Sequence, residues 1–116
     1  MAQILLVEDD TELRELIVLR LEMADHKLTC AENGLIGLNL AMDEDFDLIL
    51  MDMVMPVMDG DDALMQLRKF GYKNKIVVIT AAFPQDKVTN SYFPGCDDVI
   101  CKPITDGFEE RIAAYF

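Results

Sequence analysis

Five short apolar runs divide this chain, and a segment of helical character follows each of them. The runs occupy residues 3–7, 28–31, 47–52, 75–79 and 98–101. Each is short enough for one strand, and the run at 47–52 is apolar enough to be buried on both faces. Strands that alternate with helices predict a parallel sheet covered on both sides. At 116 residues the chain fits one domain, residues 1–116, with a doubly wound α/β fold.

The intervening segments have apolar residues at the spacing of one helical face. The first helix is predicted over 11–22, with Asp10 or Thr11 as its N-cap. The others are predicted over 35–44, over 61–70, within 83–95 as a short helix bounded by prolines, and over 106–115. The side chains expected to face inward are Leu13, Leu16, Ile17 and Leu21, then Leu35, Leu38, Ala41 and Met42, then Ala63, Leu64 and Leu67, and finally Phe108, Ile112 and Tyr115.

Composition excludes several classes of function. The net charge of −12 argues against direct nucleic-acid binding and against an anionic membrane surface. No apolar run approaches the ~20 residues of a membrane span, and the N-terminus does not resemble a signal peptide. The three cysteines have no metal-type spacing. We therefore expect a cytoplasmic protein that contacts neither nucleic acid nor membrane.

Polar residues follow four of the five predicted strands. Glu8 and Asp9 follow the first, Asp52 ends the third, Thr80 follows the fourth and Lys102 follows the fifth. In an open parallel sheet, ligands bind outside the carboxyl ends of the strands, where the strand order reverses. These five side chains are therefore predicted to converge on one crevice.

Each residue also has a simpler interpretation. Asp9 is a possible cap of the first helix, with Glu12 completing a capping box, and Asp52 is a possible first residue of a polar loop. Separately, Thr80 and Lys102 carry little information. The combination favours a functional site, because chance must otherwise place all of them at strand ends.

Electrostatics indicates what such a site holds. Two carboxylates ~5 Å apart repel by roughly 3 kcal/mol at an effective dielectric constant of 20. Lys102 supplies one positive charge against three negative ones, so a hard divalent cation, Mg²⁺, is the expected complement. A carboxylate beside a metal and a lysine is a nucleophile toward phosphorus, and phosphoryl transfer depends mainly on charge neutralisation. Asp52 is the predicted nucleophile, with Lys102 and Thr80 for the phosphoryl oxygens.

Four motifs, in this order and spacing, resemble the receiver domain of bacterial two-component response regulators over essentially the whole chain. They are Ile-Leu-Leu-Val-Glu-Asp-Asp at 4–10, Asp-Leu-Ile-Leu-Met-Asp-Met-Val-Met-Pro-Val-Met-Asp-Gly at 47–60, Ile-Thr-Ala at 79–81 and Cys-Lys-Pro at 101–103. We therefore expect a flavodoxin-like fold, with a five-stranded sheet of order 2-1-3-4-5 and five helices.

The resemblance also implies roles for individual residues. Asp52 would accept a phosphoryl group from a phosphohistidine on a sensor histidine kinase or a histidine phosphotransfer protein. The Mg²⁺ ligands would be Glu8, Asp9, Asp52 and the Val54 carbonyl, and Thr80 and Lys102 would hold the phosphoryl group. Pro103 matches a position where a cis peptide is common. Such a domain catalyses its own phosphorylation and dephosphorylation and is not a turnover enzyme.

One departure and two alternatives accompany this interpretation. The family commonly has an aromatic residue three positions before the lysine, whereas this chain has Val99, which is short and stiff at χ1. A pseudo-receiver that serves only as an interaction module is the main alternative, and the retained acids and lysine argue against it. A small phosphatase of the aspartyl-phosphate type would need a second Asp at position 54, where this chain has Val54.

Overall fold

A computed structural model describes residues 2–81 and 94–116. Its five strands form one parallel sheet with the order β2-β1-β3-β4-β5, which confirms the predicted doubly wound fold. The strands are β1 (Gln3–Val7), β2 (Lys27–Ala31), β3 (Leu48–Asp52), β4 (Lys75–Thr80) and β5 (Asp98–Cys101). Each lies within one residue of its predicted bounds. The short helix predicted within 83–95 falls largely on residues 82–93, outside the described part of the chain.

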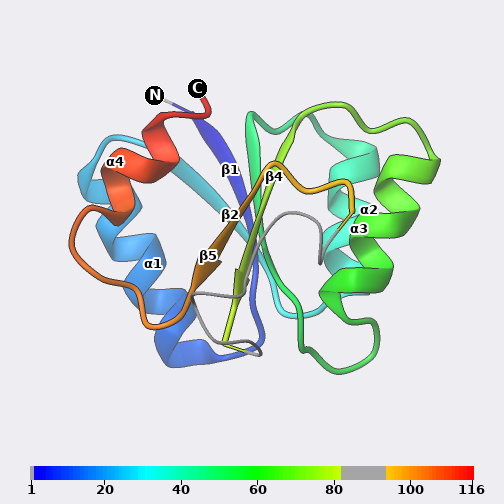
Figure 1. Cartoon of the computed structure of the whole chain (residues 1–116), viewed down its shortest axis with the longest axis horizontal. Coiled ribbons are helices and arrows are strands. Elements are labelled where there is room, and N and C mark those ends of the chain that lie inside the picture. The colour runs from blue at the N-terminus through cyan, green and yellow to red at the C-terminus, as the bar shows by residue number, and fades with distance from the viewer. Residues whose placement is uncertain (1, 82–93) are drawn as a thin grey trace.

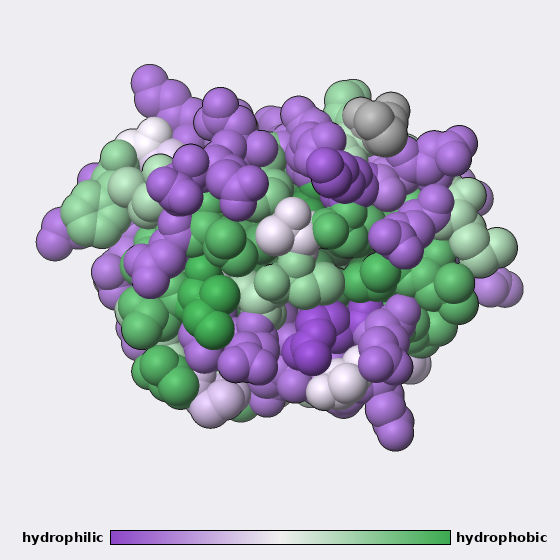
Figure 2. All heavy atoms as spheres, turned by 180° about the vertical axis from the view of Figure 1, so that it is seen from behind, coloured by the Kyte–Doolittle hydropathy of each residue, from purple (hydrophilic) through white to green (hydrophobic). Residues whose placement is uncertain are grey.

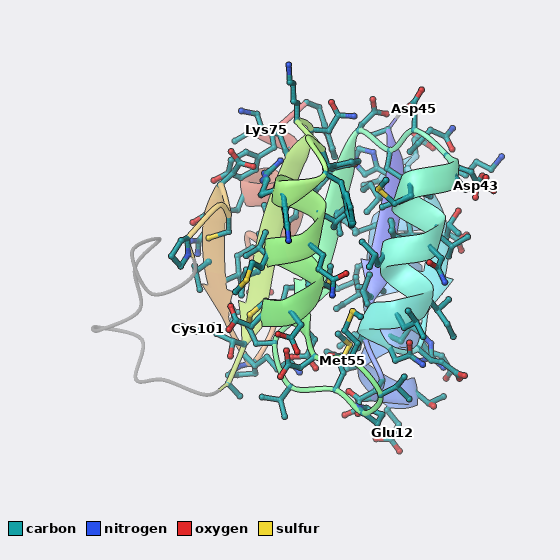
Figure 3. The ribbon with its side chains drawn as sticks, turned by 90° about the vertical axis from the view of Figure 1, so that its right-hand side faces the viewer. Glu12, Asp43, Asp45, Met55, Lys75 and Cys101 are labelled. Carbon is teal, nitrogen blue, oxygen red and sulfur yellow. The ribbon has the colours of Figure 1, made fainter. Side chains whose placement is uncertain are left out.

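Helices cover both faces of the sheet. They are α1 (Thr11–Met23), α2 (Gly34–Asp43), α3 (Gly60–Lys69) and α4 (Phe108–Ala113). Helices α1 and α4 lie on one face and α2 and α3 on the other (Figure 1), and α2 and α3 run side by side (Figure 3). None of the described helices has the length and apolar character needed to cross a membrane.

The core has two halves, one on each face of the sheet. Alternate residues of a strand point to opposite faces, so Leu5 and Val7 belong to the half under α2 and α3, while Ile4 and Leu6 belong to the half under α1 and α4. Strand β3 lies between β1 and β4 and is buried along its whole length. The run that ends at Asp52 is therefore the centre of the fold.

Helix α2 presents a different face to the sheet from the one predicted. Leu38 and Ala41 are buried as expected, but Leu35 and Met42 are exposed. The reason is a strip of small residues, since Gly34 and Gly37 are also buried, and a Cβ on Gly37 would lie 2.6 Å from a methyl carbon of Val7. Close packing of this strip turns the two larger side chains toward solvent.

Two smaller predictions also need correction. Leu16 on α1 was expected to face inward, but it is 44% exposed, whereas Ile17 and Leu21 are buried. Helix α4 is shorter than predicted because it begins after Gly107, whose φ of 87° is outside the helical range. Its inward residues Phe108 and Ile112 are buried as predicted.

Candidate functional site

Three of the five residues predicted to converge, Asp9, Asp52 and Lys102, line a hollow of about 420 Å³ at the carboxyl ends of the central strands. Its lining consists of Asp9, Asp10, Asp52, Val54, Ala81 and Lys102. A larger hollow of about 490 Å³ lies along α2, but Asp43 is the one charged residue in its lining. The hollow at the strand ends is therefore the one whose lining carries the groups needed for chemistry, three acids and a lysine.

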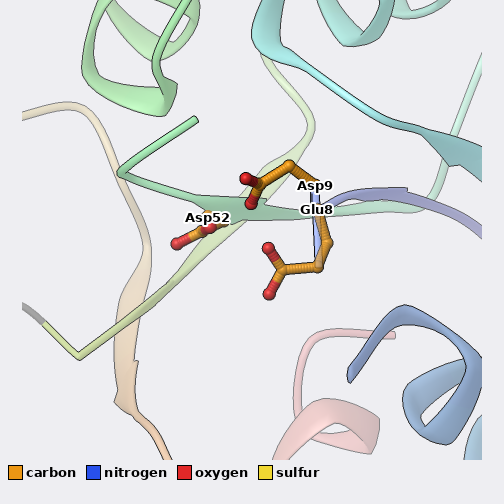
Figure 4. A group of neighbouring side chains, drawn as sticks. All are labelled: Glu8, Asp9 and Asp52. Carbon is orange, nitrogen blue, oxygen red and sulfur yellow. The ribbon is translucent and has the colours of Figure 1, made fainter. Parts of the chain in front are cut away.

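Three carboxylates meet at this hollow. Glu8, Asp9 and Asp52 each offer an oxygen, and these oxygens all lie within 4.8 Å of one another. Figure 4 shows the three side chains converging from the ends of β1 and β3. Glu8 is only 1% exposed and Asp52 5% exposed, whereas Asp9 is open to solvent. Two buried acids and one accessible acid thus share one small volume.

Lys102 supplies positive charge to the two buried acids. Its Nζ atom lies 2.9 Å from Oε1 of Glu8 and 3.5 Å from Oδ1 of Asp52. The Lys102 backbone is held in place as well, because its N–H donates to the Thr80 carbonyl at 2.9 Å. Thr80 itself is 1% exposed, at the end of β4. The amine and the acids therefore lie together, as predicted, and the end of β4 at Thr80 lies beside Lys102.

The buried acid pair is electrostatically strained. Burial raises the pKa of Glu8, its hydrogen bond with Asp52 raises it further, and Lys102 only partly offsets both, so the pKa reaches about 7. Burial lowers the pKa of Lys102, but its hydrogen bond to Glu8 and the charge of Asp52 raise it more, and the net shift is upward. Lys102 stays charged, yet one lysine does not satisfy three carboxylates.

The donor set fits a hard divalent cation. Oε2 of Glu8 is buried and has no hydrogen-bond partner among the described residues. An unpaired buried carboxylate oxygen is costly, and carboxylate oxygens are typical ligands of Mg²⁺ and Ca²⁺. The exposed Asp9 gives an ion a route from solvent into the cluster.

The alternative role of Asp9 as a helix cap is wrong. Asp10 is the N-cap of α1, and its Oδ1 accepts from the N–H groups of Glu12 at 3.0 Å and Leu13 at 3.3 Å. Capping is thereby assigned to Asp10, and the Asp9 carboxylate points into the cluster instead (Figure 4). Asp10 was one of the two N-caps predicted from the sequence, and the structure confirms it.

The loop after Asp52 is fitted tightly beneath the site. A Cβ added to Gly60 would lie 1.8 Å from the Asp52 carbonyl oxygen, so only glycine permits this approach. The Gly34 N–H donates to the Met58 carbonyl at 2.8 Å and fixes the loop to the start of α2. Val54 lines the hollow from this loop. On the other side of the hollow, the Lys102–Pro103 peptide is cis, as the motif implied.

Sequence reasoning missed one contributor to the site. Nη1 of Arg14 donates to the Glu8 carbonyl at 2.7 Å, which ties α1 to the end of β1. The contact joins a side chain to a backbone carbonyl, and the residue pattern gave no signal of it. Val99, where the family commonly has an aromatic residue, is buried in the core half under α2 and α3.

Sequence comparison agrees with this geometry. Residues 4–112 match the family described as the response regulator receiver domain. The chain is 33% identical over 108 residues to the chemotaxis protein CheY of Halobacterium salinarum, covering 89% of this chain and 87% of that protein. It is 32% identical over 111 residues to SilR of Salmonella typhimurium, a probable transcriptional regulatory protein, covering 96% of this chain but only 48% of SilR.

Solved structures agree as well. The receiver domain of the Francisella response regulator 1452 superposes with a TM-score of 0.91 at 25% identity, covering 99% of this chain and 96% of that domain. TrrA of Thermotoga maritima, in complex with Mg²⁺-BeF, superposes with a TM-score of 0.86 at 25% identity. The comparison covers 100% of both chains. TrrA has also been solved in complex with the histidine kinase ThkA. The chain belongs to the receiver-domain family of response regulators, the signalling domains of two-component systems.

Proposed function

We propose that residues 1–116 act as one phosphoacceptor switch in which Asp52 is the phosphorylated residue. The observation that carries the proposal is the position of Asp52, buried at the end of the central strand between a lysine amine and two further carboxylates. A carboxylate here has a cation on one side and an accessible hollow on the other. This is the arrangement that transfer of a phosphoryl group to an acid requires.

The proposed donor is a phosphohistidine on a sensor histidine kinase or a histidine phosphotransfer protein. The complex of TrrA with the kinase ThkA supports this class of partner. An Asp52 carboxylate oxygen attacks phosphorus, an O–P bond forms, and the P–N bond to the imidazole breaks with its electron pair going to nitrogen. With a proton on the other ring nitrogen of the phosphohistidine, the products are an acyl phosphate on Asp52 and a neutral imidazole on the partner. Hydrolysis by water later restores the carboxylate and releases inorganic phosphate.

Each neighbouring residue has a proposed task in this step. The Lys102 ammonium neutralises charge on one phosphoryl oxygen, and the Thr80 hydroxyl donates a hydrogen bond to another. Glu8, Asp9, Asp52 and the Val54 carbonyl would hold Mg²⁺, which when bound supplies positive charge to the phosphoryl group. The complex of TrrA with Mg²⁺-BeF supports both the ion and the anion site. Catalysis would be confined to the domain's own phosphorylation and dephosphorylation.

Beryllofluoride, a non-hydrolysable mimic of a phosphoryl group, tests the proposal. With Mg²⁺ present, beryllofluoride should raise the melting temperature of the wild-type chain, because it binds the folded state alone. Asp52→Asn should abolish the rise, and Thr80→Val and Lys102→Met should reduce it. An equal rise in the wild-type and Asp52→Asn proteins would contradict the assignment of Asp52. No rise in any of them would favour the pseudo-receiver alternative.

A further inference from the structure

Helix α1 holds both sides of the site through two arginines. We infer that Arg14 is a positioning residue for the metal-binding acids and Arg20 a positioning residue for Lys102, so that one helix keeps the two halves of the site in register. This inference rests on the proposed function. The inference goes beyond the proposed function by assigning tasks to two residues that lie outside the lining of the hollow.

Arg14 acts on the β1 side. Its Nη1 donates to the Glu8 carbonyl at 2.7 Å, within the peptide that joins Glu8 to Asp9. The Glu8 N–H is held from the other direction by the Ala31 carbonyl at 3.0 Å. The backbone of the acid pair is thus fixed at both Glu8 groups, once by the sheet and once by α1. Loss of the arginine contact removes the restraint that α1 places on the peptide between the two acids.

Arg20 acts on the β5 side. Its Nη2 donates to the Thr105 carbonyl at 3.0 Å, and its guanidinium forms a two-point ion pair with Glu109. The guanidinium carbon also lies 5.6 Å from the ring centre of Phe108. Thr105 is in the segment from Lys102 to the start of α4, three residues after the lysine. Arg20 therefore anchors this segment on the C-terminal side of Lys102. At the start of the segment, the Lys102 N–H donates to the Thr80 carbonyl at 2.9 Å.

The two contacts reach different parts of the site from one rigid element. Arg14 and Arg20 are six residues apart on α1, so they point to different sides of the helix. One contacts the segment that carries Glu8 and Asp9, and the other contacts the segment that carries Lys102. Loss of each arginine should therefore weaken the binding of a different ligand, whereas a general loss of stability would not separate the two ligands.

Separate titrations of Mg²⁺ and beryllofluoride test this division of tasks. Arg14→Met should weaken Mg²⁺ binding about tenfold, because residues that orient metal ligands typically contribute that much. At saturating Mg²⁺ it should leave beryllofluoride affinity close to that of the wild type. Arg20→Met should do the reverse, with beryllofluoride binding weakened on the order of tenfold through displacement of Lys102. Calorimetry measures the first affinity and ¹⁹F NMR the second.

Arg68→Met is the matched control. Arg68 also holds backbone carbonyls and a carboxylate, with contacts of 2.7 Å to Tyr72, 2.9 Å to Asn74 and 3.1 Å to Asp97. These contacts lie at the opposite end of β4 and β5 from the hollow. The Arg68→Met protein should melt at a lower temperature than the wild type, and its affinities for Mg²⁺ and beryllofluoride should be unchanged.

Two further results decide the inference. Arg14→Lys and Arg20→Lys keep a donor and should recover part of each affinity, and they remain informative where a methionine variant fails to fold. Equal effects of Arg14→Met and Arg20→Met on both ligands, or effects no larger than those of Arg68→Met, would overturn the inference and leave the proposed function intact. A wild-type chain that binds neither ligand would instead overturn the proposed function.

Discussion

Asp9 and Asp10 are neighbours in the sequence with separate structural environments. Asp10 caps α1 through the N–H groups of Glu12 and Leu13, whereas Asp9 contributes an exposed oxygen to the carboxylate cluster. Without Mg²⁺, Asp10→Ala should lower the free energy of unfolding by about 1 kcal/mol through loss of the cap. Asp9→Ala should leave it unchanged or raise it, because it relieves repulsion with Glu8 and Asp52. Urea denaturation measures both.

Addition of Mg²⁺ should raise the melting temperature of the Asp10→Ala protein more than that of the Asp9→Ala protein. The wild-type and Asp10→Ala proteins should gain melting temperature in millimolar Mg²⁺, because the ion binds the folded cluster. Asp9→Ala should gain little. A normal Mg²⁺ response in Asp9→Ala would remove Asp9 from the set of metal ligands.

Val57 occupies a backbone conformation that a β-branched residue rarely adopts. Its φ is 69°, and the Met58 N–H donates to the Pro56 carbonyl at 2.8 Å, which closes a γ-turn around it. The side chain is 77% exposed, so little burial offsets the strain. Val57→Asn should therefore raise the free energy of unfolding by about 1 kcal/mol. Val54→Asn, at an exposed position without a positive φ, should give no such gain in the same denaturation experiment.

The candidate site was predicted from residue types at strand ends, and its backbone contacts were not. Parallel strands place their carboxyl ends along one edge, so Glu8, Asp52 and Lys102 converge once the strands are located. Arg14 and Arg20 act through the carbonyls of Glu8 and Thr105, and a carbonyl is present at every position of the sequence. Pattern reasoning identifies the chemical groups of a site more readily than the residues that hold them.

At the scale of elements, β5 and α4 are joined by an ion pair that responds to pH. Two of the three guanidinium nitrogens of Arg111, Nη2 and Nε, donate to the Asp98 carboxylate at 2.8 and 2.9 Å. Burial raises the pKa of Asp98, but Arg111, the Tyr115 hydroxyl and the Val99 N–H lower it more, so the net pKa lies below the usual 3.8. The carboxylate is therefore more stable in the folded chain than in the unfolded one.

This depressed pKa fixes the direction of the pH dependence. The stabilisation from Asp98 is present above the unfolded pKa of about 4 and is lost as the pH falls through the folded pKa. At pH 7, Asp98→Asn should lower the free energy of unfolding by about 1 kcal/mol. The difference from wild type should shrink as the pH falls below about 4 and through the lower folded-state pKa, as measured by urea denaturation. Asp45→Asn, at an exposed carboxylate before β3, should show neither effect, and a pH-independent deficit in Asp98→Asn would exclude this linkage.

The elements show which parts of the fold can be read from sequence. All five strands were predicted within one residue, because an apolar run bounded by polar residues leaves few alternatives. Two of the four residues predicted to face inward on α2, Leu35 and Met42, were predicted wrongly because a large apolar side chain gives a stronger pattern than a glycine. Only the structure shows that Gly37 must lie against Val7 and that Leu35 therefore faces solvent.

At the scale of the whole molecule, the fold brings the carboxyl ends of its central strands to one accessible hollow. Both halves of the core support this arrangement, because each half covers one face of the sheet and β3 lies between β1 and β4 (Figure 1). The far face, toward β2, shows hydrophobic side chains between hydrophilic ones (Figure 2). The chain spans 87% of CheY from Halobacterium salinarum but about half of SilR, so the same unit occurs in relatives of different length.

Phosphorylation of Asp52 in a site completed by Mg²⁺ is tested by intact-mass spectrometry after incubation with acetyl phosphate and Mg²⁺. We predict that the wild-type chain gains the mass of one phosphoryl group, that chelation of Mg²⁺ prevents the gain, and that Asp52→Asn shows none. A wild-type chain without added mass, or an Asp52→Asn chain phosphorylated to the same extent, would contradict this proposal.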